Sequence, residues 1–127
     1  FEKYKEWAKT EIIFITQIEH FEGVNNLESI LALEEVDGFI VGPYDLSGSL
    51  NVPGEWEHPD VIQALNKVKN VISKQNKPGG FHVVHSNQKE LEQRIGDGYT
   101  FIAYGVDMVF FAKTIEVESN LISKLKR

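Results

Sequence analysis

The chain has 127 residues, of which 19 are acidic and 13 basic, with a formal net charge of −6 and no cysteine. This length predicts one globular unit of residues 1–127, and the acidic balance argues against nucleic acid as a partner, because binding to the phosphate backbone depends on clustered Lys and Arg. The absence of cysteine excludes disulfides, thiolate nucleophiles and Cys-ligated zinc, and it favours a reducing, cytoplasmic location.

The first part of the chain predicts helix, strand, helix and strand in that order. Residues 1–9 carry apolar side chains at helical spacing between charged ones, which indicates an amphipathic helix. Residues 12–18 are rich in β-branched side chains without alternation, as expected for a parallel strand that is buried on both faces. A helix of about a dozen residues then starts near Val24 and closes at Glu35, before a second buried strand at 38–42.

The longest predicted loop covers residues 43–58, which contain prolines and glycines and show no clear period. Loops of this length inside a compact domain are uncommon and tend to be functional. Pro59 suits the first position of a helix, and apolar side chains at helical spacing extend that helix to about residue 76.

The remaining residues predict two more strands, each followed by a helix. Strands 80–84 and 100–104 are separated by a shorter helix that includes Leu91 and Ile95, and residues 107–127 form the last helical segment. The order is a helix followed by four strand–helix units, which predicts an α/β fold with a parallel sheet. Functional groups of such folds lie at the carboxyl ends of the strands.

Two carboxylates follow neighbouring strands of the predicted sheet. Glu19 comes where the chain leaves the first strand, and Asp45 comes just after the second. Because the carboxyl ends of parallel strands meet at one edge, we expect both side chains there, where they would suit a hard divalent cation such as Mg²⁺ or Mn²⁺. The simpler interpretation is that each is a solvated loop acid or a helix cap, and the spacing leaves both interpretations open.

Other catalytic chemistries have less support. Ser47 lacks the Gly-x-Ser-x-Gly elbow of a serine hydrolase, and the lysines lie on helices or on the amino side of the third strand, which disfavours a lysine Schiff base. His82 lies inside the third strand and His85 at its end. A buried strand histidine is more often a hydrogen-bonded structural residue, but on the inner side of the sheet His82 could hydrogen-bond a substrate oxygen.

Short motifs along the whole chain resemble those of the HpcH/HpaI aldolase and citrate lyase family. The most specific is Gly-Pro-x-Asp-Leu-Ser at residues 42–47, which follows Gln-x-Glu at residues 17–19. Further motifs that carry the resemblance are His58-Pro59-x-Val61, Lys77-Pro78-Gly79-Gly80 and Ala103-Tyr104-Gly105-Val106-Asp107. The resemblance covers essentially all 127 residues.

That family has a (β/α)8 barrel of about 250 residues, so the resemblance implies that the chain is the C-terminal half of a TIM barrel, α-(βα)4, with strands five to eight. The family performs metal-dependent retro-aldol cleavage, in which a 4-hydroxy-2-oxo acid gives pyruvate and an aldehyde through a metal-stabilised enolate. The resemblance therefore implies a class II aldolase or lyase fragment. Its cofactor would be Mg²⁺, Mn²⁺ or Co²⁺, and its partners pyruvate or a related 2-oxo acid and a small aldehyde.

The family's roles carry over onto individual positions. Glu19 and Asp45 resemble the metal ligands, and Gln17 resembles the side chain that reaches the bound oxo acid. The backbone N–H groups of Tyr44 and Asp45 resemble those that hold its carboxylate, and His82 stands in the substrate pocket where some relatives carry an aliphatic residue. The family's catalytic base, a histidine, and an enolate-stabilising arginine come from the first half of the barrel, so we expect the fragment to be incomplete or inactive alone.

Half a barrel would expose the sheet edges that pair with the missing strands, which favours association. We expect either two copies that close an eight-stranded barrel or assembly with the missing half, and because the chain begins with Phe1 we expect it to be a piece of something longer. The alternative is a non-catalytic half-barrel or flavodoxin-like domain that binds an anionic metabolite or a partner. No apolar stretch approaches the roughly 18 residues that span a bilayer, so we expect no membrane partner.

Overall fold

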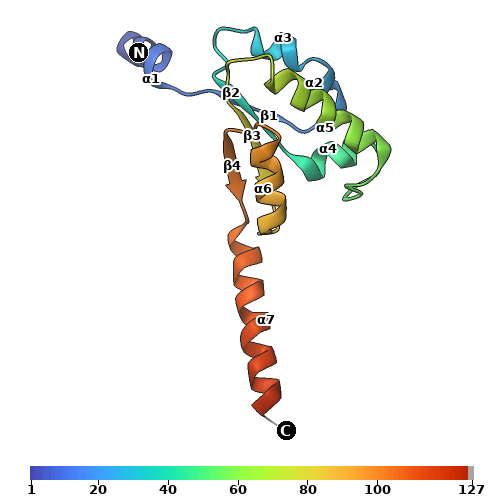
Figure 1. Ribbon diagram of the computed structural model, residues 1–127. Coiled ribbons are helices and arrows are strands. Elements are labelled where there is room, and N and C mark those ends of the chain that lie inside the picture. The colour runs from blue at the N-terminus through green and yellow to red at the C-terminus, as the bar shows by residue number, and fades with distance from the viewer. Residues whose placement is uncertain (126–127) are drawn as a thin grey trace.

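A four-stranded parallel sheet forms the centre of the protein (Figure 1). The computed structural model describes residues 1–125. The strands, in the order in which they lie side by side, are β1 (Ile15–Ile18), β2 (Gly38–Val41), β3 (Gly79–Val83) and β4 (Phe101–Tyr104). Each strand pairs in parallel with the next one along the chain, which confirms the predicted α/β class with a parallel sheet.

Helices precede the sheet and follow its strands. They are α1 (Glu2–Glu11), α2 (Phe21–Asn25), α3 (Leu27–Leu31), α4 (Pro43–Ser49), α5 (Pro59–Ile72), α6 (Gln88–Gly96) and α7 (Asp107–Leu125). Residues 126 and 127, the end of the last predicted helix, lie outside the described residues. The observed order keeps the predicted alternation of strands and helices.

The hydrophobic core lies between one face of the sheet and helices α2, α3 and α5. Alternate residues of a strand point to opposite faces, and Phe39, Val41, Phe81 and Val83 are all fully buried on the helix side. Burying each of these side chains contributes roughly 2 kcal/mol to folding. The helices contribute Val24, Leu27, Leu31, Ala64, Val68 and Val71 to the core.

The opposite face of the sheet is open, which contradicts one prediction. Residues 12–18 predict a strand that is buried on both faces, but β1 begins only at Ile15. The side chains of Ile13 and Phe14 are 77% and 53% exposed, and Gln17 within the strand is exposed as well. The prediction is wrong for this chain. An apolar run indicates that a strand is buried, but it does not indicate whether the residues that bury it belong to the same chain.

Two further predictions differ from the structure. The single helix predicted after the first strand is divided into α2 and α3 at Asn26, whose side-chain amide donates to the carbonyl oxygen of Glu22 over 2.8 Å. The loop predicted over residues 43–58 begins with α4, because Pro43 at the first helical position already has a helical φ. Only residues 50–58 of that segment consist of turns and irregular structure.

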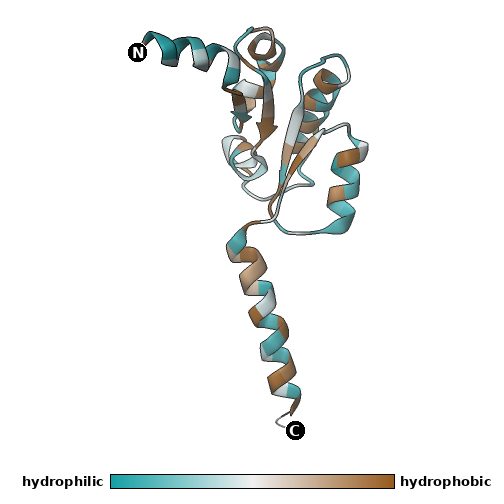
Figure 2. Cartoon of the chain, turned by 90° about the vertical axis from the view of Figure 1, so that its left-hand side faces the viewer, coloured by the Kyte–Doolittle hydropathy of each residue, from teal (hydrophilic) through white to brown (hydrophobic). Residues whose placement is uncertain are grey.

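The last helix, α7, extends away from the rest of the protein (Figure 1). None of its described residues is buried, and hydrophobic residues recur along its length, as the brown segments in Figure 2 show. Met108, Phe111 and Leu125 are 74%, 69% and 77% exposed. Near its start, the ammonium group of Lys113 donates to the carbonyl and hydroxyl oxygens of Ser86, which fixes the beginning of the helix to the loop after β3.

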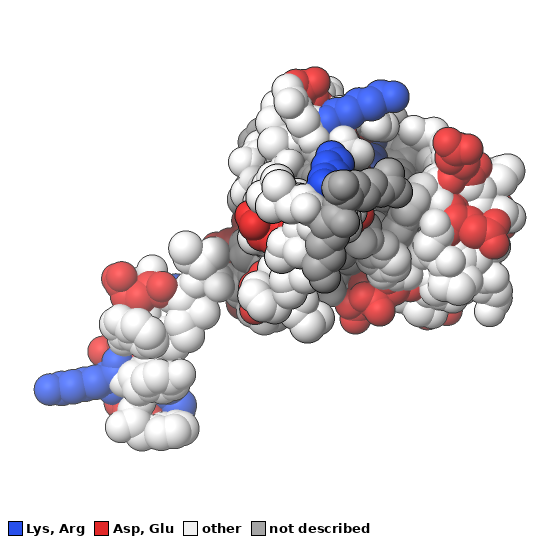
Figure 3. All heavy atoms as spheres, turned by 90° about the horizontal axis from the view of Figure 1, so that it is seen from below, with Lys and Arg blue, Asp and Glu red and all other residues white. Residues whose placement is uncertain are grey.

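The charges of the surface are mixed. Figure 3 shows acidic side chains around the body of the protein and side chains of both signs on the arm formed by α1. Among residues 1–125, no helix combines the length and the apolar composition that crossing a membrane requires.

A partly buried group of charges joins α5, α6 and β3. The guanidinium of Arg94 lies over the ring of Phe81, 4.1 Å from its centroid, and Arg94 Nη1 is 3.6 Å from Asp97 Oδ2. Asp97 Oδ1 accepts a 2.6 Å hydrogen bond from Lys69 Nζ. Burial raises the pKa of the neighbouring Tyr99 hydroxyl well above its ordinary value, and the positive charge of Arg94 opposes that shift. Asp97 is therefore an anion that two cations share.

Replacing Asp97 with Asn is expected to lower the free energy of unfolding by about 1–2 kcal/mol, because Arg94, in a partly buried position, loses one of its two carboxylate partners and keeps only Glu90, 3.4 Å away. The loss stays below that of a fully buried pair, since the Asp97 side chain is 18% exposed. Urea denaturation measures the change. Glu116→Gln on the exposed surface of α7 is the control, and equal stability of the two variants would contradict this role of Asp97.

Candidate functional site

The register of the sheet places two of the predicted site residues on its open face. Gln17 pairs with Ile40, and Ile40 pairs with Gly80. Paired residues of parallel strands point to the same face, and His82 follows Gly80 by two positions, so it points there as well. The structure therefore brings the side chains of Gln17 and His82 to the face of the sheet that the helices leave open.

Gln17 and Glu19 form a pair beside the backbone of Gly42. Gln17 Nε2 donates to Glu19 Oε2 over 2.7 Å, and the amide of Gly42 donates to the carbonyl oxygen of Ile18 over 3.1 Å. A Cβ atom at position 42 would lie 2.8 Å from Gln17 Nε2 and 3.3 Å from Glu19 Cβ. Glycine at position 42 thus leaves space for the side-chain amide of Gln17, which holds the Glu19 carboxylate in a fixed direction.

Asp45 lies in the first turn of α4, the helix that begins directly after Gly42. Its side chain is exposed, as is that of Glu19. Within the described residues, neither carboxylate takes part in an ion pair with Lys, Arg or His. The end of β1 and the start of α4 therefore present two uncompensated carboxylates at the same edge of the sheet.

This donor set suits a hard divalent cation, provided that the ion takes further ligands from elsewhere. Carboxylate oxygens are the ligands that Mg²⁺ and Mn²⁺ prefer, and Mg²⁺ usually keeps several waters and binds substrate oxygens beside one or two carboxylates. In residues 1–125 no cluster of three or more His, Cys, Asp or Glu side chains could hold a metal ion. Glu19 and Asp45 could hold an ion of this kind together with water and an oxygen-rich ligand.

The side chain of Tyr44 makes contacts that the sequence analysis missed. Its hydroxyl shares a 3.0 Å hydrogen bond with His85 Nε2, and its ring packs edge-on against Trp56 with the centroids 4.8 Å apart. No local pattern could reveal this contact, because Tyr44 and His85 lie 41 residues apart in the chain. A small pocket at this point is lined by Pro43, Tyr44, Trp56, His82, Val84, His85 and Glu90.

Ser47 fixes the loop of residues 50–58 to α4. Its side chain is completely buried, and its hydroxyl donates to the carbonyl oxygen of Tyr44 over 2.8 Å and accepts from the amide of Gly54 over 3.0 Å. Its carbonyl oxygen accepts a 3.0 Å hydrogen bond from the amide of Val52. Ser47 is therefore the structural residue of the Gly-Pro-x-Asp-Leu-Ser motif. In the sequence, only its place in that motif indicates this role.

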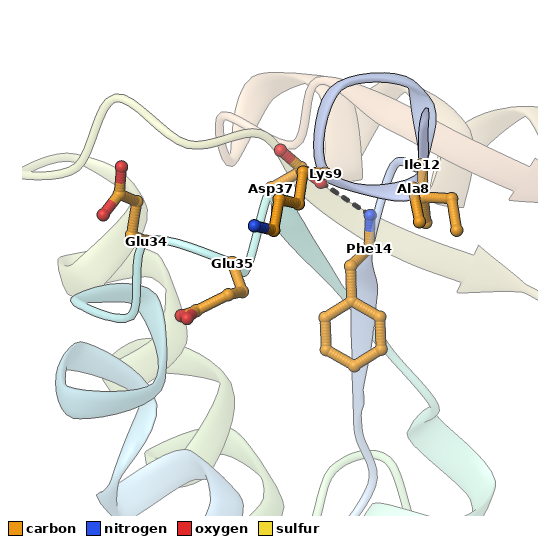
Figure 4. A pocket seen from close by; sticks show the side chains of 7 residues that line it. All are labelled: Ala8, Lys9, Ile12, Phe14, Glu34, Glu35 and Asp37. Atoms are coloured by element: carbon orange, nitrogen blue, oxygen red, sulfur yellow. Dashed lines mark hydrogen bonds between the residues drawn. The ribbon is translucent and has the colours of Figure 1, made fainter. Parts of the chain in front are cut away.

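A larger hollow of about 720 Å³ lies at the opposite edge of the sheet, at the amino ends of β1 and β2 (Figure 4). It is lined by Ala8, Lys9, Ile12, Phe14, Glu34, Glu35 and Asp37. The backbone amide of Phe14 donates to Asp37 Oδ2 over 2.6 Å, as the dashed line in Figure 4 shows. Because catalytic groups of α/β folds lie at carboxyl ends of strands, the size of this hollow does not make it the candidate site.

Comparisons with known sequences find aldolases of one family. The sequence model of the HpcH/HpaI aldolase/citrate lyase family matches residues 2–114. A 5-keto-4-deoxy-D-glucarate aldolase of Shigella dysenteriae is 32% identical to this chain over 117 residues, which make up 92% of this chain and 45% of the relative. The chain thus spans about half the length of the curated relatives that it matches.

Solved structures give the same picture. An HpcH/HpaI aldolase from Desulfitobacterium hafniense superposes with a TM-score of 0.80 and 27% identity over 95% of this chain and 46% of its own. An HpcH/HpaI aldolase/citrate lyase family protein from Burkholderia cenocepacia gives a TM-score of 0.82 and 25% identity over 97% of this chain and 48% of its own. These neighbours are TIM-barrel aldolases, and the fold described above corresponds to about half of such a barrel.

Replacing Ser47 with Ala is expected to lower the free energy of unfolding by about 1–3 kcal/mol, because the Tyr44 carbonyl and the Gly54 amide each lose a hydrogen bond to a completely buried hydroxyl. Urea denaturation measures the loss. Ser123→Ala serves as the matched control, since the hydroxyl of Ser123 is exposed and donates only to a carbonyl within its own helix. A stability change no larger than that of the control would disprove the structural role of Ser47.

Proposed function

Because the chain belongs to the HpcH/HpaI aldolase/citrate lyase family, we propose that it carries the divalent-metal and 2-oxo-acid site of a class II aldolase. The reaction would cleave a 4-hydroxy-2-oxo acid to pyruvate, or a related 2-oxo acid, and a small aldehyde. The observation that supports it most is the pair of uncompensated carboxylates of Glu19 and Asp45 at the carboxyl edge of the sheet. The name of the Shigella dysenteriae relative, an aldolase of a keto sugar acid, supports the same substrate class.

In this proposal Glu19 and Asp45 hold Mg²⁺, Mn²⁺ or Co²⁺, since two carboxylates suit each of these ions. When bound, such a cation supplies Lewis-acid stabilisation for the negative charge that develops on the oxo group of the substrate. The Gln17 amide keeps the Glu19 carboxylate directed toward the ion through the 2.7 Å hydrogen bond between them. This arrangement agrees with the general rule that a metal-binding carboxylate is itself hydrogen-bonded by a neighbouring group.

The substrate would lie on the open face of the sheet, beside the carboxylates. The Gln17 side chain reaches the oxo acid, and the backbone N–H groups of Tyr44 and Asp45 hold its carboxylate. His82 shares the open face with Gln17 and lines the pocket beside Tyr44, so its imidazole is placed to hydrogen-bond a substrate oxygen. The catalytic base and the enolate-stabilising arginine of the family would come from the other half of the barrel.

The open face also supports association, either with a second copy that completes eight strands or with the missing half of the barrel. The outer edges of β1 and β4 have no neighbouring strand among residues 1–125. An unpaired strand edge is a template for pairing with another chain. A cytoplasmic location stays a prediction that rests on the cysteine-free composition.

The metal site is tested by titrating Mn²⁺ into the chain and its variants Glu19→Gln and Asp45→Asn. Each substitution keeps the shape of the side chain and removes its charge, so the affinity for Mn²⁺ is expected to fall by more than about tenfold. Isothermal titration calorimetry or the electron paramagnetic resonance signal of free Mn²⁺ measures it. Glu28→Gln, at an exposed acid of α3, is the control; equal affinity in all four proteins would refute the metal site.

Association is tested by sedimentation velocity at micromolar concentration, where the chain is expected to sediment as a species larger than the monomer. Ile13→Lys places a charge on the exposed apolar segment that leads into β1 and is expected to shift the distribution toward monomer. Ile62→Lys, at an exposed position of α5 on the helix side, should leave it unchanged. A monomeric wild-type chain would argue against association.

A further inference from the structure

The aromatic ring of Tyr44 is held from two directions. Its hydroxyl meets Nε2 of His85 over 3.0 Å, and its ring meets the ring of Trp56 at an interplanar angle of 85° with the centroids 4.8 Å apart. Each partner comes from a different part of the chain, since His85 follows β3 and Trp56 belongs to the loop after α4. A side chain that is held at its hydroxyl and against its ring has little rotational freedom left.

The position of Tyr44 makes this restraint relevant to its neighbour. Tyr44 lies in the first turn of α4 between Pro43 and Asp45, and its carbonyl oxygen accepts the hydrogen bond from the buried hydroxyl of Ser47. Fixing the Tyr44 ring therefore fixes the backbone from which the Asp45 side chain extends. Asp45 itself is exposed and has no side-chain contact of its own among the described hydrogen bonds and ion pairs, so its placement depends on this backbone.

The bond between Tyr44 and His85 also ties the start of α4 to the neighbouring strand β3. The backbone of Gly42 is already bonded to β1 through the carbonyl oxygen of Ile18. The turn that carries Asp45 is thus connected on one side to the strand that leads to Glu19 and on the other to the segment that follows β3. The hydrogen bond to His85 is the longer-range of these two connections, spanning 41 residues.

We propose that His85 is a positioning residue, which holds Tyr44 and through it orders the first turn of α4, including Asp45. The inference deepens the proposed function, and its importance for metal binding rests on the assignment of Asp45 as a ligand. His85 acts through Tyr44, whose hydroxyl engages its Nε2. Tyr44 therefore contributes its side chain to the site as well as its backbone.

Hydrogen exchange of the metal-free chain, followed by mass spectrometry, tests the positioning role. His85→Ala and Tyr44→Phe both remove the hydrogen bond, so amides of residues 44–49 are expected to exchange about threefold to tenfold faster than in the wild type. His85→Gln places an amide near the position of Nε2 and should restore most of the protection. Tyr4→Phe, at an exposed tyrosine of α1, is the control and should exchange as the wild type does.

The double variant Tyr44→Phe/His85→Ala adds a second criterion. If the two side chains act through one hydrogen bond, the double variant should exchange no faster than either single variant. Unchanged exchange of residues 44–49 in both single variants would overturn the proposal. It would also be overturned by additive effects, which would show that the two side chains act independently, or by a failure of His85→Gln to restore protection, which would show that this hydrogen bond does not order the helix.

Mn²⁺ titration of the same variants separates this inference from the proposed function. His85→Ala and Tyr44→Phe are expected to bind Mn²⁺ about threefold to tenfold more weakly, and His85→Gln close to the wild-type affinity. Absence of Mn²⁺ binding in the wild type would overturn the proposed metal site, while the exchange experiment alone decides whether His85 orders α4. Unaltered Mn²⁺ affinity in variants with faster exchange would overturn the link from His85 to Asp45.

Discussion

Side chains alternate between the two faces of a β-strand, and in this short parallel sheet the alternation decides what each residue can do. Phe39 and Phe81 point to the helices and are fully buried there. Gln17 and His82 belong to the other set of positions and cannot join that core. In a closed eight-stranded barrel the second face is the inside, so the packing that stabilises the fold also selects the residues that are available for chemistry.

The exposed side chains of the candidate site are held by hydrogen bonds and by close packing with buried neighbours. Gly42 leaves space for Gln17 and Glu19, and the buried Ser47 holds the following loop against α4. A site of this kind has little burial to keep its groups in place, so individual hydrogen bonds determine where its carboxylates lie. The short helix α4 connects these ties, which makes the Gly-Pro-x-Asp-Leu-Ser motif as much a structural unit as a set of ligands.

Local patterns predict most of this architecture. The order of the elements, the parallel sheet and the location of Glu19 and Asp45 at strand ends all follow from short-range patterns. Helix α4 is missed because Pro43 and the glycine-containing residues after it have the composition of a loop, although proline favours the first position of a helix. The Tyr44 to His85 bond depends on the sheet bringing distant segments together, and the open face depends on what lies outside this sheet. Neither feature can be predicted from local sequence patterns.

Helix α7 has a consequence for how this chain folds. It comprises 19 residues, and none of them is buried. A solitary helix of this length is only marginally stable in water, since most of the stability of protein helices comes from the packing of their apolar side. Contacts at its first turns, such as that of Lys113 with Ser86, anchor only its beginning. Because residues 1–125 bury no part of α7, packing of its apolar side would have to come from the association proposed above, and the helicity of α7 would then depend on that assembly.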